Sequence, residues 1–285
     1  MKSDLHCHST ASDGLLTPRE LVLRAHAQGI ERLALTDHDT LAGLPEAMAC
    51  CKAHAIEMIA GIELSTHWSG IGIHIVGLNF DPRHPAMQQA VTFQAQARSE
   101  RAQLIAARLE KRGFKEVLAG AQRIAGEGVN LGRPHIARYL VESEQIESVD
   151  QAFKHYLGAG KIGDIKCAWP DLPQTLSWIV EAGGVAVLAH PDKYNMTRSK
   201  LRRLIQAFKD AGGEAIEVVS GMQNPDVTAF MARLADEYGL YASCGSDFHG
   251  PASTWHDLGK YTPLPKAVAP VWNSWIGAEF QQEFV

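Results

Sequence analysis

The sequence lacks long apolar runs. No stretch approaches the ~18 consecutive apolar residues that suggest a membrane-spanning helix. The first residues, MKSDLHCH, contain no apolar segment of the kind found in secretory signals. We therefore expect a cytoplasmic protein that has no membrane partner.

Cysteines, aromatic residues and net charge are also limited. The five cysteines are odd in number, include an adjacent pair and form no C-x-x-C motif, so free thiols are expected. Aromatic residues make up 7% of the chain, and 27 basic against 32 acidic residues give a net charge of -5. This balance argues against a protein that coats nucleic acid, and no DNA partner is expected. It is compatible with a local anion-binding site.

Histidine, in contrast, is abundant, with 13 in 285 residues. His6 and His8 form an H-x-H pair that follows a short strand-like segment, with Asp13 shortly after. Residues i and i+2 of a strand point to the same side, so both imidazoles can reach one metal ion. One such pair is weak evidence, but later apolar runs carry a histidine or carboxylate at or near their ends. These residues are His38, Glu63, His74, His190, Asp247 and His249.

Strand-like runs alternate with helical segments over most of the chain. Thr17, Pro18 and Glu20 predict a helix that begins with a capping box. The alternation stops between about residues 85 and 156, where a long helix and shorter helical pieces are expected. We therefore predict a barrel formed by residues 1–97 and 166–285, with a helical insert at 98–165.

The insert is basic. Nine Lys or Arg residues against four Glu residues lie between Arg98 and Arg138, which suggests an anion-binding cap above an acidic metal site. The alternative interpretation is a solvated helix face that carries an excess of Lys and Arg.

About seven strands with polar residues at their carboxyl ends predict a barrel-like α/β fold, because the loops at that face converge. His6, His8, Asp13 and the six residues named above give nine candidate ligands. One zinc or manganese ion takes roughly four to six ligands, so nine residues suit two or three ions. A lone histidine such as His74 is more often a satisfied core residue. Burying so many polar groups without ligation would be costly, however, which favours the metal interpretation.

The motifs DLHCHS, TDHD, GIELS, HIVG, AHP and GSDFH occur in this order between residues 4 and 250. This series resembles the PHP (polymerase and histidinol phosphatase) family of the amidohydrolase superfamily. The resemblance implies a distorted seven-stranded (β/α) barrel with three divalent metal ions that hydrolyses phosphate esters. Manganese is expected first, with iron and zinc as alternatives.

The resemblance also implies how the ligands are shared. His6, His8, Glu63 and Asp247 would hold the first ion, and Asp13, His38 and His249 the second. Glu63 would bridge to a third ion held with His74 and His190. Of these residues, Asp13, His38, Asp247 and His249 are the expected catalytic residues.

Within the family, the helical insert and the segment GRPHIA at residues 132–137 resemble bacterial 3',5'-nucleoside bisphosphate phosphatases and related 5'-to-3' exoribonucleases. The expected reaction is removal of the 3'-phosphate from a small nucleotide that carries two phosphates. Arg133, His135 and Arg101 are the candidates for a second anion site. Guanidinium groups suit phosphate, and the imidazole of His135 can add a second donor or stack on a base. For Arg101 the alternative is an exposed helix residue.

Three other functions remain open at this stage. The first is the hydrolysis of short RNA that carries a 5'-phosphate, and the second is the hydrolysis of histidinol phosphate. A catalytically silent metal-binding or nucleotide-sensing module would require a lost ligand, whereas the set here is complete. The oligomeric state is left open, with a monomer as the simplest expectation.

Overall fold

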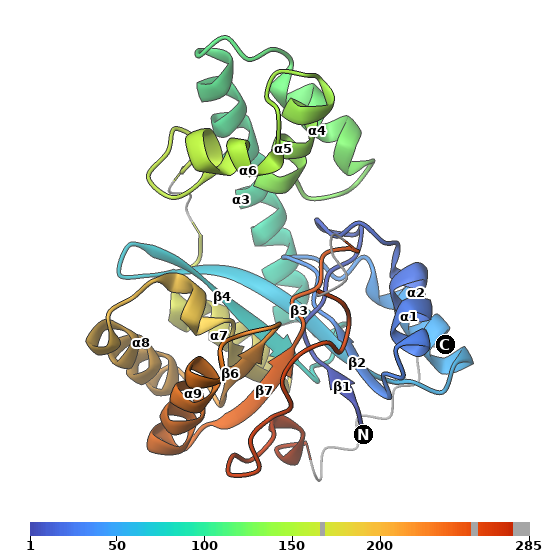
Figure 1. Ribbon diagram of the computed structural model, residues 1–285, viewed down its shortest axis with the longest axis vertical. Helices are drawn as coiled ribbons and strands as arrows, with labels where there is room; N and C mark the ends of the chain where they lie inside the picture. The colour runs from blue at the N-terminus through green and yellow to red at the C-terminus, as the bar shows by residue number, and fades with distance from the viewer. Residues whose placement is uncertain (166–168, 252–255, 276–285) are drawn as a thin grey trace.

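The computed structural model describes residues 1–165, 169–251 and 256–275. Seven strands form one sheet in chain order (Figure 1). They are β1 (Ser3–Asp4), β2 (Arg32–Leu35), β3 (Glu57–Trp68), β4 (Ile71–Leu78), β5 (Val185–Leu188), β6 (Ala215–Ser220) and β7 (Tyr241–Gly245). The segment after β1 also pairs with the segment after β7, because Cys7 forms a parallel bridge with Phe248. The sheet thus curls into a nearly closed barrel, and the predicted seven-stranded α/β fold is confirmed.

One strand, β4, departs from the parallel pattern. β4 is antiparallel to both β3 and β5, whereas the other neighbouring pairs are parallel. β3 continues beyond the apolar run at residues 58–62 that precedes Glu63, so Glu63 lies in the middle of the strand and not at its end. β3 and β4 therefore form a long hairpin whose register pairs Glu63 with Val76 and Ser65 with His74.

Helices cover the outside of the barrel. The predicted capping box is present at the start of the first helix, where Thr17 accepts from the Glu20 N–H and the Glu20 carboxylate accepts from the Thr17 N–H. The barrel helices are α1 (Pro18–Ala27), α2 (Leu44–Ala53), α7 (Leu172–Glu181), α8 (Arg198–Asp210) and α9 (Pro225–Tyr238). The large core between sheet and helices includes Leu64, Ile75 and Phe208, which are fully buried.

The insert stands above one end of the barrel (Figure 1). It contains α4 (Val117–Ala125), α5 (Arg133–Glu142), α6 (Val149–Ala152) and the π-helical turn Phe153–Leu157. The long helix α3 (Pro85–Glu110) begins against the barrel, where Met87 and Ala90 are buried, and continues into the insert. The boundary predicted at residue 98 falls inside this helix. Ile105, Leu109 and Leu140 belong to a separate hydrophobic core of the insert.

The described cysteines are buried, and the C-terminal segment packs against the barrel. Cys7, Cys50, Cys51 and Cys244 are buried and free, as expected, and Cys167 lies outside the described residues. Val271, Trp272 and Trp275 pack with the apolar residues inside the barrel, such as Leu5 and Val187. Phe280 lies outside the described residues. Every helix in the described part of the chain is too short or too polar to traverse a bilayer.

Candidate metal centre and active site

All nine predicted ligands converge at the barrel end that faces the insert. Their ligand atoms form four overlapping groups, within each of which the atoms lie no more than 4.8 Å apart. The groups are His8, Asp13, His38 and His249; His6, His8 and Asp247; His6, Glu63 and His190; and His38, Glu63 and His74. The barrel thus brings together side chains that are up to 243 positions apart in sequence, from His6 to His249.

Glu63 occupies the middle of this cluster. Its side chain is fully buried, and both carboxylate oxygens face imidazole nitrogens. Oε2 lies 3.2 Å from His6 Nε2, 3.3 Å from His8 Nε2 and 3.0 Å from His38 Nδ1. Oε1 lies 2.9 Å from His74 Nδ1 and 2.9 Å from His190 Nε2. One carboxylate therefore faces two sets of nitrogens, which is the arrangement that a bridging ligand requires.

The other two carboxylates lie beside this centre. Asp247 Oδ1 is 3.4 Å from His8 Nε2 and 3.6 Å from His6 Nε2. Asp13 Oδ1 is 3.4 Å from His249 Nε2, and Asp13 Oδ2 is 3.8 Å from His38 Nε2. Burial alone raises the pKa of a carboxyl group, but the surrounding histidines hold the pKa values of Glu63, Asp13 and Asp247 below their ordinary values. All three are ionised, which is the form that binds a metal.

The cluster fits divalent metal ions. Several of its atoms are fully buried, with close polar neighbours but none at hydrogen-bond geometry; they include His6 Nε2, His8 Nε2, His38 Nδ1, His74 Nδ1, Asp13 Oδ1 and Glu63 Oε2. Polar atoms buried without a partner are costly and rare in proteins. Their convergence on shared points suits metal coordination, and mixed nitrogen and oxygen ligands are compatible with manganese, iron or zinc.

Glu217 supports two of the ligands, although the sequence analysis did not select it. Its Oε1 accepts a hydrogen bond from His6 Nδ1 at 2.7 Å, and its Oε2 accepts from the His190 backbone N–H at 2.6 Å. A proton held at Nδ1 leaves His6 Nε2 free to bind a metal, as a supporting carboxylate commonly arranges. The sequence signal was a carboxylate inside the otherwise apolar strand Ala215–Val219.

The backbone around the ligands is locally strained. Asp39, His190 and Asp247 have positive φ angles of 56°, 28° and 53°, a region that non-glycine residues seldom occupy. Such conformations cluster at functional sites, where the surrounding structure holds them. Gly245 is required for a different reason, because a Cβ atom there would lie 2.3 Å from Cβ of His6. The close approach of β7 to the His6 segment therefore depends on glycine.

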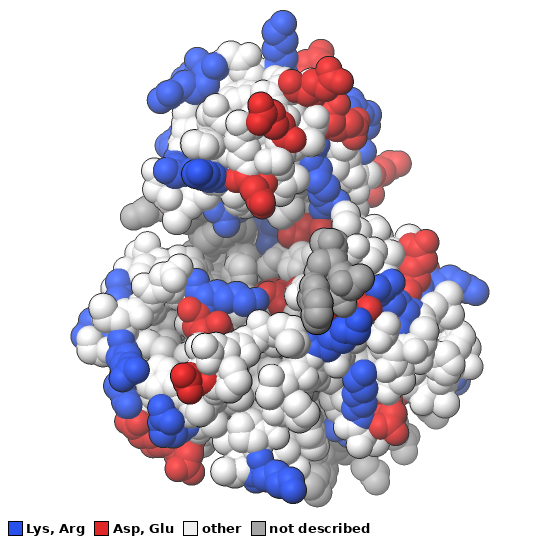
Figure 2. Space-filling view, in the orientation of Figure 1, with Lys and Arg blue, Asp and Glu red and all other residues white. Residues whose placement is uncertain are grey.

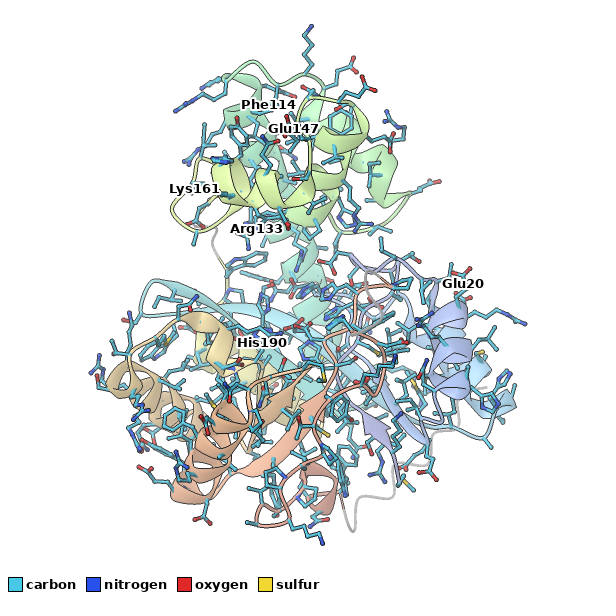
Figure 3. The ribbon with its side chains drawn as sticks, in the orientation of Figure 1. Glu20, Phe114, Arg133, Glu147, Lys161 and His190 are labelled. Carbon is cyan, nitrogen blue, oxygen red and sulfur yellow. The ribbon has the colours of Figure 1, made fainter. Side chains whose placement is uncertain are left out.

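A cavity of about 880 Å³ lies between the metal cluster and the insert. Figure 2 shows the molecular surface hollowed between the two parts. Asp13, His38 and His190 line the barrel side, and Arg101, Arg133 and Trp169 are also among the lining residues. In Figure 3, Arg133 lies on the lower side of the insert and His190 below it at the barrel. The cavity thus has the candidate ligands on its barrel side and Arg133 on its insert side, with Arg101 and Asp164 also in its lining.

The three predicted substrate-binding residues differ in their placement. Arg101 lies beside the cavity with its guanidinium 5.5 Å from the Trp169 ring. Arg133 lines the cavity and donates from Nη1 to Leu157 O at 3.0 Å. His135 is not among the residues that line it: its side chain is 2% exposed, and Nδ1 accepts the Gly132 N–H at 3.0 Å. The structure therefore gives His135 a helix-capping contact.

Two cations that the sequence analysis did not select lie near the ligands. Lys193 lines the cavity and forms an ion pair with Asp247, with Nζ 2.6 Å from Oδ2. Arg98 is buried and donates from Nε to Asp39 Oδ2 at 2.6 Å. Asp39 directly follows His38, and its N–H donates to Glu63 O. These contacts connect Arg98, at the start of the insert, to the backbone of His38 and Glu63.

The comparison with protein families agrees with this geometry. The model of the PHP domain matches residues 4–221. The chain belongs to the PHP domain family. This PHP domain is 48% identical over 272 residues to a 5'-3' exoribonuclease from Haemophilus influenzae, a match that spans 95% of this chain and 98% of the relative. It is 42% identical over 270 residues to a 3',5'-nucleoside bisphosphate phosphatase from Chromobacterium violaceum, which spans 95% of each chain.

Solved structures share the fold of this PHP domain. An amidohydrolase from Chromobacterium violaceum, described with bound sulfate and no metal, superimposes with a TM-score of 0.90 at 41% identity, covering 96% of this chain and 95% of that one. A protein from Bifidobacterium adolescentis, assigned as a metal-dependent phosphoesterase, gives a TM-score of 0.80 at 26% identity, covering 94% and 92%. The chain is therefore a phosphoesterase of the PHP family, with candidate metal-binding clusters of His, Asp and Glu.

The capping contact of His135 leads to a pH prediction for this PHP domain. Burial, aided by the nearby Arg138, lowers the pKa of His135 from 6.5 to about 4. At pH values between these two pKa values, His135 is protonated in the unfolded chain more than in the folded protein. The free energy of unfolding therefore falls as the pH falls. From pH 7 to pH 5, the wild type should lose about 2 kcal/mol more than His135→Gln. Urea unfolding of both proteins at the two pH values measures this, and equal losses would contradict it.

Proposed function

We propose that this PHP domain removes the 3'-phosphate from nucleoside 3',5'-bisphosphates, giving the nucleoside 5'-monophosphate and phosphate. The observation that carries the proposal is the cavity between barrel and insert, with the candidate metal centre on one wall and the cations Arg101 and Arg133 also lining it. A substrate with two phosphates needs two anion sites that are separate in space. The insert, residues 98–165, acts in this proposal as the cap that supplies the second one.

The proposed metal centre holds three divalent ions, with manganese as the first choice. The contacts around Glu63 support part of the grouping expected from the family, although His38 also faces Oε2 and His190 also groups with His6. His6, His8 and Asp247 approach one another on the Oε2 side of that carboxylate, while His74 and His190 approach Oε1. Asp13, His38 and His249 lie in a further group that also includes His8. When bound, such ions lower the pKa of a coordinated water towards ~7 and offset negative charge on phosphoryl oxygens.

The chain's own residues would position and stabilise the reacting phosphate. Asp13, His38, Asp247 and His249 are proposed as the catalytic residues, because they lie around the place where the 3'-phosphate would sit. Lys193 adds a fixed positive charge there: burial alone lowers its pKa, but Asp247 opposes this and raises the pKa above its ordinary value. A protonated Lys193 can therefore donate to a phosphoryl oxygen. Arg133 and Arg101 would hold the 5'-phosphate across the cavity.

Short RNA that carries a 5'-phosphate is the second candidate substrate. The relative from Haemophilus influenzae and one from Escherichia coli, 44% identical over 274 residues, are both named 5'-3' exoribonucleases. The chemistry is the same, since both reactions hydrolyse a phosphoester at the 3'-oxygen of a nucleotide whose 5'-phosphate is held elsewhere. Trp169, which lines the cavity, offers a ring on which a base can stack.

The test of the proposal compares phosphate release by manganese-loaded protein from four compounds. Adenosine 3',5'-bisphosphate is expected to react fast and to yield 5'-AMP, whereas 3'-AMP, 5'-AMP and histidinol phosphate should react slowly. Equal and slow release from all four would reject the bisphosphate as substrate. Short 5'-phosphorylated RNA, assayed in parallel, should release 5'-mononucleotides if the second candidate holds.

Arg133→Ala tests the second anion site. Loss of a hydrogen bond between charged groups should lower kcat/KM for the bisphosphate by roughly 10–100-fold. The rate with 3'-AMP should not change, because that substrate has no 5'-phosphate. The matched control is Arg108→Ala, since Arg108 is an exposed cap residue that donates to Ile162 O much as Arg133 donates to Leu157 O. An equal loss with both substrates would contradict a 5'-phosphate role.

A further inference from the structure

The cap contacts the loop that carries Asp13. Arg138 of α5 donates from Nη2 to the backbone oxygen of Asp13 at 2.7 Å. One turn earlier, the buried ring of His135 forms a hydrogen bond with the backbone of Ser12. From the barrel side, Asp37 accepts hydrogen bonds from the Ser9 N–H and hydroxyl and from the Ser12 hydroxyl. The loop is therefore held between the barrel and α5.

The cap also contacts the segment that carries His38. Arg98 pairs with Asp39, and the side-chain amide of Asn130, in the loop between α4 and α5, donates to Asp39 O at 3.3 Å. Asp39 is fully buried and adopts a positive φ angle. The Asp39 carboxylate also accepts from the N–H and hydroxyl of Ser65 on β3, so the orientation of His38 depends on contacts from the barrel and from the cap together.

Other ligands are held by barrel residues. Glu217 on β6 fixes His6 and His190, and the hydroxyl of Tyr194 accepts the backbone N–H of His74 at 2.9 Å. The backbone N–H of Asp247 donates to His6 O at 2.8 Å. These supports join the carboxyl ends of strands to one another and to the loop after β5.

We propose that the cap sets the affinity of one ion position, the one formed by His8, Asp13, His38 and His249, independently of the positions held by the barrel. Arg138 is the main positioning residue in this arrangement. Supporting contacts of this kind fix a ligand in its binding orientation, and their loss typically costs roughly 10–100-fold in metal affinity. The inference rests on the proposed metal centre and is independent of the identity of the substrate.

Arg138→Met tests the proposal because it keeps the aliphatic stem and removes the donor. Manganese binding is measured on the wild type and the variant by competition with a fluorescent chelator and by metal analysis after dialysis. We expect one ion, the one beside Asp13, His38 and His249, to bind roughly 10–100-fold less tightly in Arg138→Met, with the other ions unaffected. Anomalous scattering at the manganese edge from crystals of the variant should show the depleted peak beside Asp13, His38 and His249.

Two further variants control for folding and for charge. Arg138→Lys keeps one donor and should restore part of the affinity. Arg123→Met removes another cap arginine, which forms an exposed ion pair with Glu142 and lies over the Tyr139 ring, and should bind manganese as the wild type does. Wild-type affinity in Arg138→Met, or equal weakening of every ion, would overturn the proposal. Failure of the wild type to bind manganese at all would instead reject the metal centre itself.

Discussion

Replacing Glu63 by glutamine is expected to abolish most of the hydrolytic activity and to lower the number of ions bound. Glutamine has nearly the same shape but carries no charge, and one of its two oxygens becomes an amide nitrogen that cannot bind a metal. Five imidazole nitrogens face the Glu63 oxygens at 2.9–3.3 Å, so both sides of the centre would lose their shared anion. A metal contributes several kcal/mol of transition-state stabilisation, so the loss in kcat should be roughly thousandfold or more.

The matched control for this change lies on the same strand. Glu57 begins β3, pairs with Arg32 and is exposed, so Glu57→Gln makes the same chemical change away from the site. Its rate and metal content should equal those of the wild type. The measurements are kcat with the bisphosphate and ions retained after dialysis. Glu63→Gln with unchanged metal content and a rate within tenfold of the wild type would contradict a bridging role.

The sequence predicted which side chains would converge, because their positions follow from local rules. Residues at the carboxyl ends of barrel strands meet at one face, and both the H-x-H pair and His190 obey this rule. Glu63 is expected at a strand end, yet it lies inside β3, whereas His74 lies within the strand β4 as its apolar neighbours indicate. Ser65 and Thr66 are polar, so no apolar run indicates that β3 continues beyond Glu63. Pairing with the antiparallel β4 determines where β3 ends, and that is a tertiary property.

The residues that support the ligands could not be predicted in the same way. Glu217 is 211 positions from His6, and Arg98 is 59 positions from Asp39, so no local pattern connects them. For His135, in contrast, a local sequence pattern was present. Its spacing from Gly132 is that of a helix N-cap and the third helical residue, and the structure uses the imidazole for this capping contact. The motif was recognised, but the chemistry of its histidine depends on burial, which the sequence does not state.

Arg98→Leu is expected to cost about 3–5 kcal/mol in the free energy of unfolding, because removing one partner of a buried ion pair leaves the other charge unpaired. Asp39 is fully buried, and Ser65 would remain as its main side-chain donor. Urea unfolding of chelator-treated protein measures the loss without a contribution from bound metal. The matched control on the same helix is Arg108→Leu, whose side chain is exposed and whose substitution should change stability by about 0.5 kcal/mol or less.

A second substitution at Asp39 separates the unpaired charge from lost packing. Asp39→Asn in the Arg98→Leu background removes the buried charge while keeping an acceptor for Ser65. If the charge is the cause, the double variant should be more stable than Arg98→Leu alone. With Asp39→Asn measured alone as well, the interaction energy between the two substitutions should be about 0.5–3 kcal/mol. Equal or lower stability of the double variant would assign the loss to packing of the Arg98 side chain against Trp169, whose ring lies 5.7 Å from the guanidinium. The ion pair would then serve to orient His38 and Glu63 without contributing to the stability of the fold.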